Sequence, residues 1–149
     1  MPLYKRIFVA IDGSPTSDKA LDESIRLAQS CGASLRLLHV VDELGYVNGF
    51  EPAMNYVNEI VPLMREAGEK LLTHGRQKAL DKGVAADSVL VIGGPGRISE
   101  HVNEQASLAN ADLIVLGSHG RRGLGRVLLG SDAEQIVRHA TLPVLIVRA

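Results

Sequence analysis

Short runs of aliphatic residues alternate along this chain with segments whose apolar residues recur every three to four positions. The short runs are typical of strands buried on both faces, and the longer period is typical of helices that bury one face. The runs predict strands at residues 4–11, 34–41, 88–92, 113–116 and 144–147, and the longer period predicts helices at residues 15–31, 59–82, 98–109 and 131–140.

Strands that alternate with helices predict an α/β fold, an open five-stranded parallel sheet with helices on both faces, because right-handed crossovers of this length allow little else. A Rossmann-like strand order of 3-2-1-4-5 would place the first and fourth strands side by side. Such sheets bind ligands beyond the carboxyl ends of the strands, where the strand order reverses. The 149 residues contain no internal repeat and no low-complexity linker, so we expect a single domain over residues 1–149.

Residues at the predicted helix ends support these boundaries. Ser14 or Thr16 is a candidate cap for the first helix, Pro15 suits its first turn, and Gly32 suits the position that follows it. Residues 44–58 show no clean period and are interpreted as a lid or a partner surface. The second helix is expected to bury one apolar face, made by Ile60, Met64, Ala67 and Leu71 with Leu63 and Leu72 on its flank.

Composition and charge exclude several classes of protein. Lys and Arg number 16 and Asp and Glu number 17, so no net field attracts the chain to nucleic acid or to an anionic membrane. No segment reaches the roughly 20 apolar residues of a membrane span, and the amino-terminal residues lack a signal-peptide pattern. The single cysteine, Cys31, cannot form an internal disulfide, which favours a reducing compartment. We therefore expect a cytoplasmic protein with no nucleic-acid or membrane partner.

A glycine-rich loop follows the fourth predicted strand. The strand ends at Gly117, and the loop holds five glycines before Ser131. Ser131, with Glu134 three residues later, predicts a capping box at the start of the last helix. Backbone N–H groups and the positive end of the helix dipole would then face the loop and suit an anion such as a phosphate chain. Glycines also serve turns and helix ends without a ligand, so their number alone leaves both interpretations open.

The spacing of the loop residues favours a ligand. The pattern Gly117-x2-Gly120-x9-Gly130-Ser131 matches G-2x-G-9x-G-[S/T], and the chain thereby resembles the ATP-binding members of the universal stress protein family. The stretches LIVLGSHG and LLGSDAEQIVRHATLPVLIV add to this resemblance, which extends from the first strand to the last residue. The resemblance implies an adenine nucleotide (ATP, ADP or AMP) as the ligand, with Mg²⁺ as a candidate companion ion.

The resemblance also implies individual contacts for the nucleotide. The adenosine end would contact Asp12, Val40 and Leu116, and the ribose would lie by Gly117. The phosphates would be held by Gly120, Gly130 and Ser131, through backbone N–H groups and the Ser131 hydroxyl group. Asp12 could instead serve only to cap the first helix.

Other polar residues of the chain leave their roles open. The loop also carries His119, Arg121, Arg122 and Arg126, which could contact phosphate or form a solvated surface. The histidines at positions 39, 74, 101 and 139 occur singly and are interpreted as structural, because no pair has metal-ligand spacing. A phosphate-bridged Mg²⁺ would lie near Asp12, and Asp42 is the further acidic residue at a neighbouring strand end.

Two functions of different classes follow. The first is a regulatory protein of the stress response, in which bound ATP orders the loop and residues 44–58 and so changes a partner surface. The second is a slow ATPase or an enzyme of adenylate chemistry, which fold analogy alone supports. The chain lacks GxxxxGK[ST], so fast phosphoryl transfer is not expected. A dimeric scaffold with an empty pocket is a third interpretation.

The last predicted strand suggests an assembly. Residues 144–147 would form an aliphatic sheet edge, and such an edge favours pairing with another copy of the chain. We expect a homodimer through the edge from Pro143 to Arg148, and the family resemblance implies that the two edges pair antiparallel.

Overall fold

The computed structural model describes residues 2–42, 59–93, 96–118 and 129–148. The strands form one parallel sheet of order β3-β2-β1-β4-β5, which confirms the predicted fold class and strand order. The elements are β1 (Arg6–Ala10), α1 (Pro15–Cys31), β2 (Ser34–Asp42), α3 (Val61–Asp81), β3 (Ala86–Gly93), α4 (Ile98–Leu108), β4 (Leu113–Gly117), α5 (Ser131–His139) and β5 (Val144–Val147).

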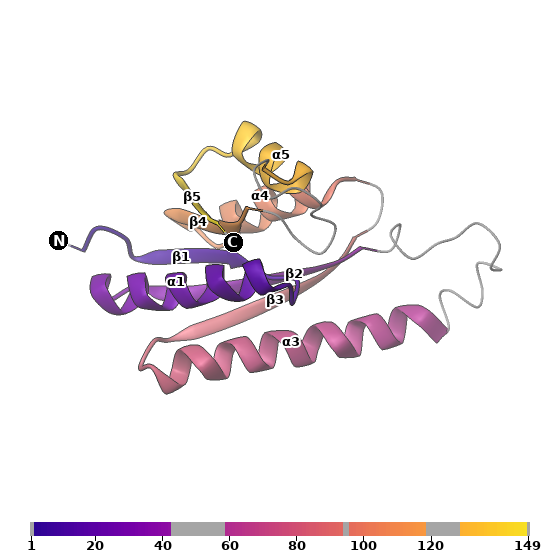
Figure 1. Ribbon diagram of the computed structural model, residues 1–149, viewed down its shortest axis with the longest axis horizontal. Helices are drawn as coiled ribbons and strands as arrows, with labels where there is room; N and C mark the ends of the chain where they lie inside the picture. Colours follow the sequence, from indigo (N-terminus) through magenta and orange to yellow (C-terminus); the bar gives the residue numbers. More distant parts are fainter. Residues whose placement is uncertain (1, 43–58, 94–95, 119–128, 149) are drawn as a thin grey trace.

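The helices cover both faces of the sheet. Helices α1 and α3 pack on one face, and α4 and α5 pack on the other (Figure 1). Because each crossover is right-handed, the helices that connect strands toward β3 lie on one face, and those that lead back toward β5 lie on the opposite face. Helices α1 and α5 therefore begin near neighbouring strand ends but on opposite faces of the sheet.

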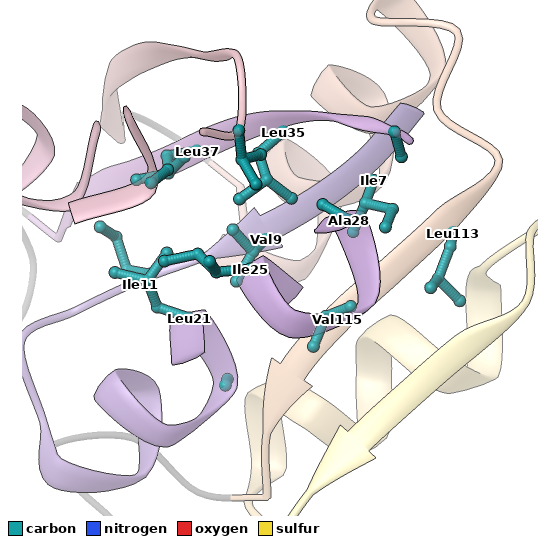
Figure 2. Packing of buried hydrophobic residues seen from close by; sticks show 14 of the residues in the cluster. Ile7, Val9, Ile11, Leu21, Ile25, Ala28, Leu35, Leu37, Leu113 and Val115 are labelled. Carbon is teal, nitrogen blue, oxygen red and sulfur yellow. The ribbon is translucent and has the colours of Figure 1, made fainter. Parts of the chain in front are cut away.

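The core consists of two aliphatic clusters separated by the sheet. Strand β1 contributes to both, because alternate side chains point to opposite faces: Ile7 and Val9 enter the first cluster, and Phe8 enters the second. All three side chains are at most 1% exposed. Figure 2 shows strand residues of the first cluster facing Leu21 and Ile25 of α1. Burial on both faces explains why the central strands contain almost only aliphatic residues.

The predicted start and end of the first helix are confirmed. Ser14 is the N-cap, and its Oγ accepts a hydrogen bond from the N–H of Ser17 at 3.2 Å. Pro15 is the first helical residue. Gly32 follows the helix in the left-handed region, with φ of 69°, where a side chain would be strained.

The predicted buried face of the second helix is wrong in part. Helix α3 turns its small residues toward the sheet, whereas Leu63 is 66% exposed and Ala67 is exposed. A Cβ added to Gly75 would lie 2.6 Å from Cδ2 of Leu37 on β2. Glycine therefore lets the helix backbone approach the sheet, and this close approach sets the packed face. The buried residues of α3 are Gly68, Leu72, Gly75 and Ala79.

Two further expectations concern residues 44–58 and membrane-spanning helices. Residues 44–58, predicted to be a lid or partner surface, lie outside the described residues. In the described ranges, the helices are too short or too polar to cross a bilayer.

Candidate functional site

The point where the strand order reverses lies between β1 and β4. These strands pair in parallel, with Val9 opposite Val115, so their carboxyl ends meet at one edge of the sheet. Helix α1 begins beyond β1, and α5 follows β4 in the chain. The amino ends of two helices on opposite faces thus flank the edge, where their N–H groups and dipoles favour a negatively charged ligand.

The N-cap of α5 lies one residue before the position that the capping-box prediction requires. Gly130 is the N-cap, with an extended backbone (ψ of 153°), and Ser131 is already the first helical residue. The carboxylate of Glu134 accepts a hydrogen bond from Arg138 at 2.8 Å. The predicted capping box is therefore wrong, and α5 has no side-chain hydrogen bond at its N-cap. A helix start without a side-chain cap is well suited to an external acceptor.

Ser118 joins the two ends of the glycine-rich loop. The N–H of Gly130 donates to the carbonyl of Ser118 at 2.7 Å, and the N–H of Ser118 donates to the carbonyl of Val147 at 2.9 Å. These bonds connect the end of β4, the start of α5 and the end of β5. The position of α5 at the site is thereby tied to the edge strand β5.

Asp12 is held in place by the turn between β1 and α1. Its Oδ1 accepts a hydrogen bond from the N–H of Ser14 at 2.9 Å, and its own N–H donates to Oγ of Ser17 at 3.0 Å. Gly13 between them has φ of 83°, in the region that favours glycine. Asp12 thus stabilises the turn before α1, while Ser14 rather than Asp12 caps the helix. Its role toward a ligand stays a prediction.

The packing of α1 against β4 is sufficient to require glycine at position 117. A Cβ at this position would lie 2.8 Å from Cγ2 of Thr16 and 3.1 to 3.2 Å from the backbone C and O atoms of Thr16. The start of α1 therefore crosses directly over the end of β4. Any side chain at residue 117 would push these two elements apart.

Val40 and Leu116 lie on either side of this edge. The N–H of Ile11 donates to the carbonyl of Leu38, so Val40 lies on the strand end next to Asp12. Val40 is half-buried at the border of the second cluster. Leu116 is only 4% exposed and belongs to the same cluster, which makes it part of the floor beneath the edge.

The structure thus gathers part of the predicted site at one sheet edge. It also adds Ser17 in the turn after β1 and Ser118 at the end of β4, and it gives Thr16 a packing role on Gly117 that only a contact between distant elements shows. Among the described residues, no group of three or more His, Cys, Asp and Glu could hold a metal ion. The predicted residues at this edge are Asp12, Val40, Leu116, Gly117, Gly130 and Ser131. The predicted residues outside the described ranges are His119, Gly120, Arg121, Arg122 and Arg126.

Comparison with known proteins places this architecture in a family. Residues 3–148 match the model of the universal stress protein family. This chain belongs to the universal stress protein family. The universal stress protein YxiE of Bacillus subtilis is 36% identical over 152 residues, covering 98% of this chain and all of the relative.

Solved structures of related proteins share the fold of this universal stress protein. UspA of Lactobacillus plantarum superposes with a TM-score of 0.83 at 27% identity, over 97% of this chain and 98% of that one. A universal stress protein in complex with cAMP superposes with a TM-score of 0.67 at 25% identity, over 97% of each chain. The family assignment agrees with the resemblance noted in the glycine-rich loop.

Proposed function

We propose that this universal stress protein binds an adenine nucleotide, ATP in particular, at the carboxyl edge of β1 and β4. The observation that carries the proposal is the start of α5, which has a glycine N-cap without a side-chain hydrogen bond and lies at the point of strand-order reversal. Helix starts of this kind bind phosphate groups through backbone N–H groups. The relative that was solved with cAMP supports an adenine nucleotide as the ligand class.

The described residues suggest how each part of the nucleotide would be held. Asp12 would accept hydrogen bonds at the adenosine end, where its carboxylate is fixed by the N–H of Ser14. Ser131 would supply its N–H and its exposed side chain to the phosphates. The N–H of Gly130 already donates to Ser118, so Gly130 would contribute mainly by leaving space for the phosphates. Mg²⁺ would neutralise phosphate charge, with Asp12 as its candidate carboxylate.

We further propose that bound ATP regulates partner binding and is turned over slowly at most. A site built from backbone N–H groups binds ground state and transition state about equally, and only interactions that strengthen in the transition state raise a rate. Ser118 connects the start of α5 to the end of β5. A ligand at the start of α5 would therefore act on the outer strand of the sheet, which is a route from the nucleotide to a partner surface.

The nucleotide proposal is tested by denaturing the purified protein and identifying the released nucleotide by chromatography. We expect ATP in nearly stoichiometric amount. Gly130→Val should raise the Kd for ATP at least about tenfold, equivalent to roughly 1.4 kcal/mol, and lower the recovered amount, because its methyl groups would occupy the phosphate space. Ala85→Val is the matched control, since Ala85 is exposed at the opposite end of the sheet.

The outcomes of this experiment separate the two classes of function. Absence of nucleotide, combined with no binding of added ATP and Mg²⁺, would contradict the site. Recovery of ADP or AMP would favour the enzyme, and a time course with radiolabelled ATP would then measure its turnover. Equal loss of nucleotide in Ala85→Val would show that the effect of Gly130→Val is not local.

We also propose a homodimer through the edge from Pro143 to Arg148. Strand β5 is the outer strand of the sheet, and its four aliphatic side chains are only half-buried. Side chains at alternate positions of β5 pack toward opposite clusters, so the strand is an integral part of the sheet. The backbone groups on its outer side face away from β4. A second copy would cover this edge.

A cytoplasmic location is proposed on the basis of Cys31. The single cysteine is half-buried against the first cluster as a free thiol. A reducing compartment would preserve it in that form.

A further inference from the structure

The pairing of β1 with β2 ends earlier than the pairing of β2 with β3. The register of β1 and β2 stops at Ala10 opposite Leu38, whereas β2 and β3 stay paired as far as Asp42 opposite Gly93. Figure 1 shows β2 and β3 continuing together beyond the end of β1. The last backbone bond between β1 and β2 runs from the N–H of Ile11 to the carbonyl of Leu38 at 2.8 Å. Beyond this bond the two strands separate, at the edge where the nucleotide is proposed to bind.

The imidazole of His39 takes the place of the next bond in this ladder. In a parallel pair, a residue that donates to one position accepts from the residue two positions further along, so the carbonyl of Ile11 should accept from the N–H of Val40. That carbonyl instead lies 2.9 Å from Nδ1 of His39. Because a carbonyl oxygen can only accept, Nδ1 carries a proton and donates it. Within the described ranges, the N–H and the carbonyl of Val40 have no hydrogen-bond partner.

Both backbone groups of Val40 point toward the space that β1 leaves. Successive residues of a central strand bond to opposite neighbours, and the N–H of Leu35 donates to Ala85 next to β3. By this alternation Val40 faces the side of β1. Val40 is half-buried, and unpaired backbone groups in a shielded position are costly. A ligand that offers an acceptor beside a donor would pair both groups, and adenine offers a ring nitrogen beside its amino group.

Helix α3 determines the space available to the imidazole. A Cβ added to Gly68 would lie 2.7 Å from Cδ2 of His39 and 2.6 Å from Cδ1 of Leu90. Glycine at position 68 therefore leaves room for the ring between the backbone of α3 and the end of β1. The half-buried ring is thus held by packing on one side and by its hydrogen bond on the other.

We propose that His39 is a positioning residue that keeps the backbone of Val40 free for the base of an adenine nucleotide. The proposal rests on the nucleotide site proposed above. Loss of the imidazole would leave the carbonyl of Ile11 without its donor, and the N–H of Val40 is the group that the ladder places opposite it. The strand pair would then extend by one bond, and the base would lose a donor.

The first test needs no ligand and measures amide hydrogen exchange by NMR spectroscopy. The amide of Val40 should exchange rapidly in the unaltered protein, and His39→Leu should slow it at least about tenfold, because the amide pairs with Ile11. The amide of Ile11, which already donates to Leu38, is the reference and should stay protected in both proteins. Slow exchange of Val40 in the unaltered protein, or unchanged exchange in His39→Leu, would overturn the role of His39.

The second test measures ATP affinity by titration calorimetry. His39→Leu should raise the Kd about tenfold, as expected for the loss of one hydrogen bond, and ATP should protect the Val40 amide of the unaltered protein. His39→Asn keeps an N–H donor near the position of Nδ1 and should restore most of the affinity. His74→Leu is the matched control, because it makes the same change at an exposed position of α3.

The outcomes distinguish this proposal from the nucleotide site itself. Absence of ATP binding in every protein, with the expected exchange pattern, would contradict the nucleotide site but not the separation of the strands by His39. Equal affinity in His39→Leu and the unaltered protein would overturn the positioning role. If His39→Leu fails to fold, Gly68→Ala displaces the ring through the contact with Cδ2 and should also slow exchange of the Val40 amide.

Discussion

At the scale of single residues, the glycines of the loop signature have more than one physical role. Gly117 lies beneath Thr16, where even a methyl group would contact backbone atoms at 3.1 to 3.2 Å. Gly130 has an ordinary negative φ of −62°, so its backbone conformation does not require glycine. Gly117 is therefore explained by packing without a ligand, whereas the backbone of Gly130 would accept other residues.

Gly117→Ala should lower the free energy of unfolding by about 2 to 3 kcal/mol, because the added Cβ overlaps backbone atoms that cannot rotate away. Urea unfolding measures this change through the midpoint at constant m-value. Thr16→Ser removes Cγ2 but keeps the backbone contacts, so Thr16→Ser/Gly117→Ala should recover only part of the loss. Full recovery in the double variant would show that the methyl contact alone requires glycine.

At the scale of elements, small residues decide how closely helices approach the sheet. The large aliphatic residues of α3 predicted a face that includes Ala67, but the packed face is centred on Gly68, Leu72 and Gly75. A Cβ at Gly75 would lie within 3.5 Å of side chains from three different elements or turns. The same principle brings α1 over the end of β4 at Gly117.

Gly75→Val should lower the free energy of unfolding by about 2 to 3 kcal/mol, since overfilling a packed core costs roughly 1 to 3 kcal/mol and the small gain in helix propensity over glycine does not offset it. His74→Val is the matched control, because it introduces the same residue at the adjacent exposed position of α3. We expect the control to change stability by less than about 0.5 kcal/mol. Equal losses of the two variants in urea unfolding would mean that contact with Leu37 does not set the cost.

At the scale of the whole molecule, sheet topology creates two ends with opposite electrostatic character on one face. Helix α5 begins beside Ser118 at the end of β4, and α4 and α5 both end at the opposite edge of the sheet, near Asn110 and Thr141. Because the helices between parallel strands run antiparallel to them, this polarity follows from the fold. It is the physical basis for proposing an anionic ligand at the end where α5 begins.

The proposed dimer can be tested through the backbone of β5. The carbonyls of Pro143 and Val147 accept hydrogen bonds from β4, so by strand alternation the N–H of Ile146 points away from the sheet. Ile146→Pro removes that N–H without breaking a bond to β4 and should convert the dimer to a monomer of 16.0 kDa in sedimentation equilibrium.

Ile146→Ala is the control for this change, because it removes the side chain but keeps the outward N–H. We expect the control to remain dimeric with a weaker association. A monomeric mass for the unaltered protein at micromolar concentration would contradict the dimer, as would an Ile146→Pro variant of unchanged mass.

The sequence by itself determined the fold class, the order of the elements, the caps of α1 and the position of the glycine-rich loop. These features depend on periodicity, propensity and residue types within a few positions of each other. The tertiary structure alone decided which face of α3 is buried, why residue 117 is glycine, where α5 begins and that Ser118 links it to β5. These features depend on contacts between residues far apart in the chain, which local patterns do not encode.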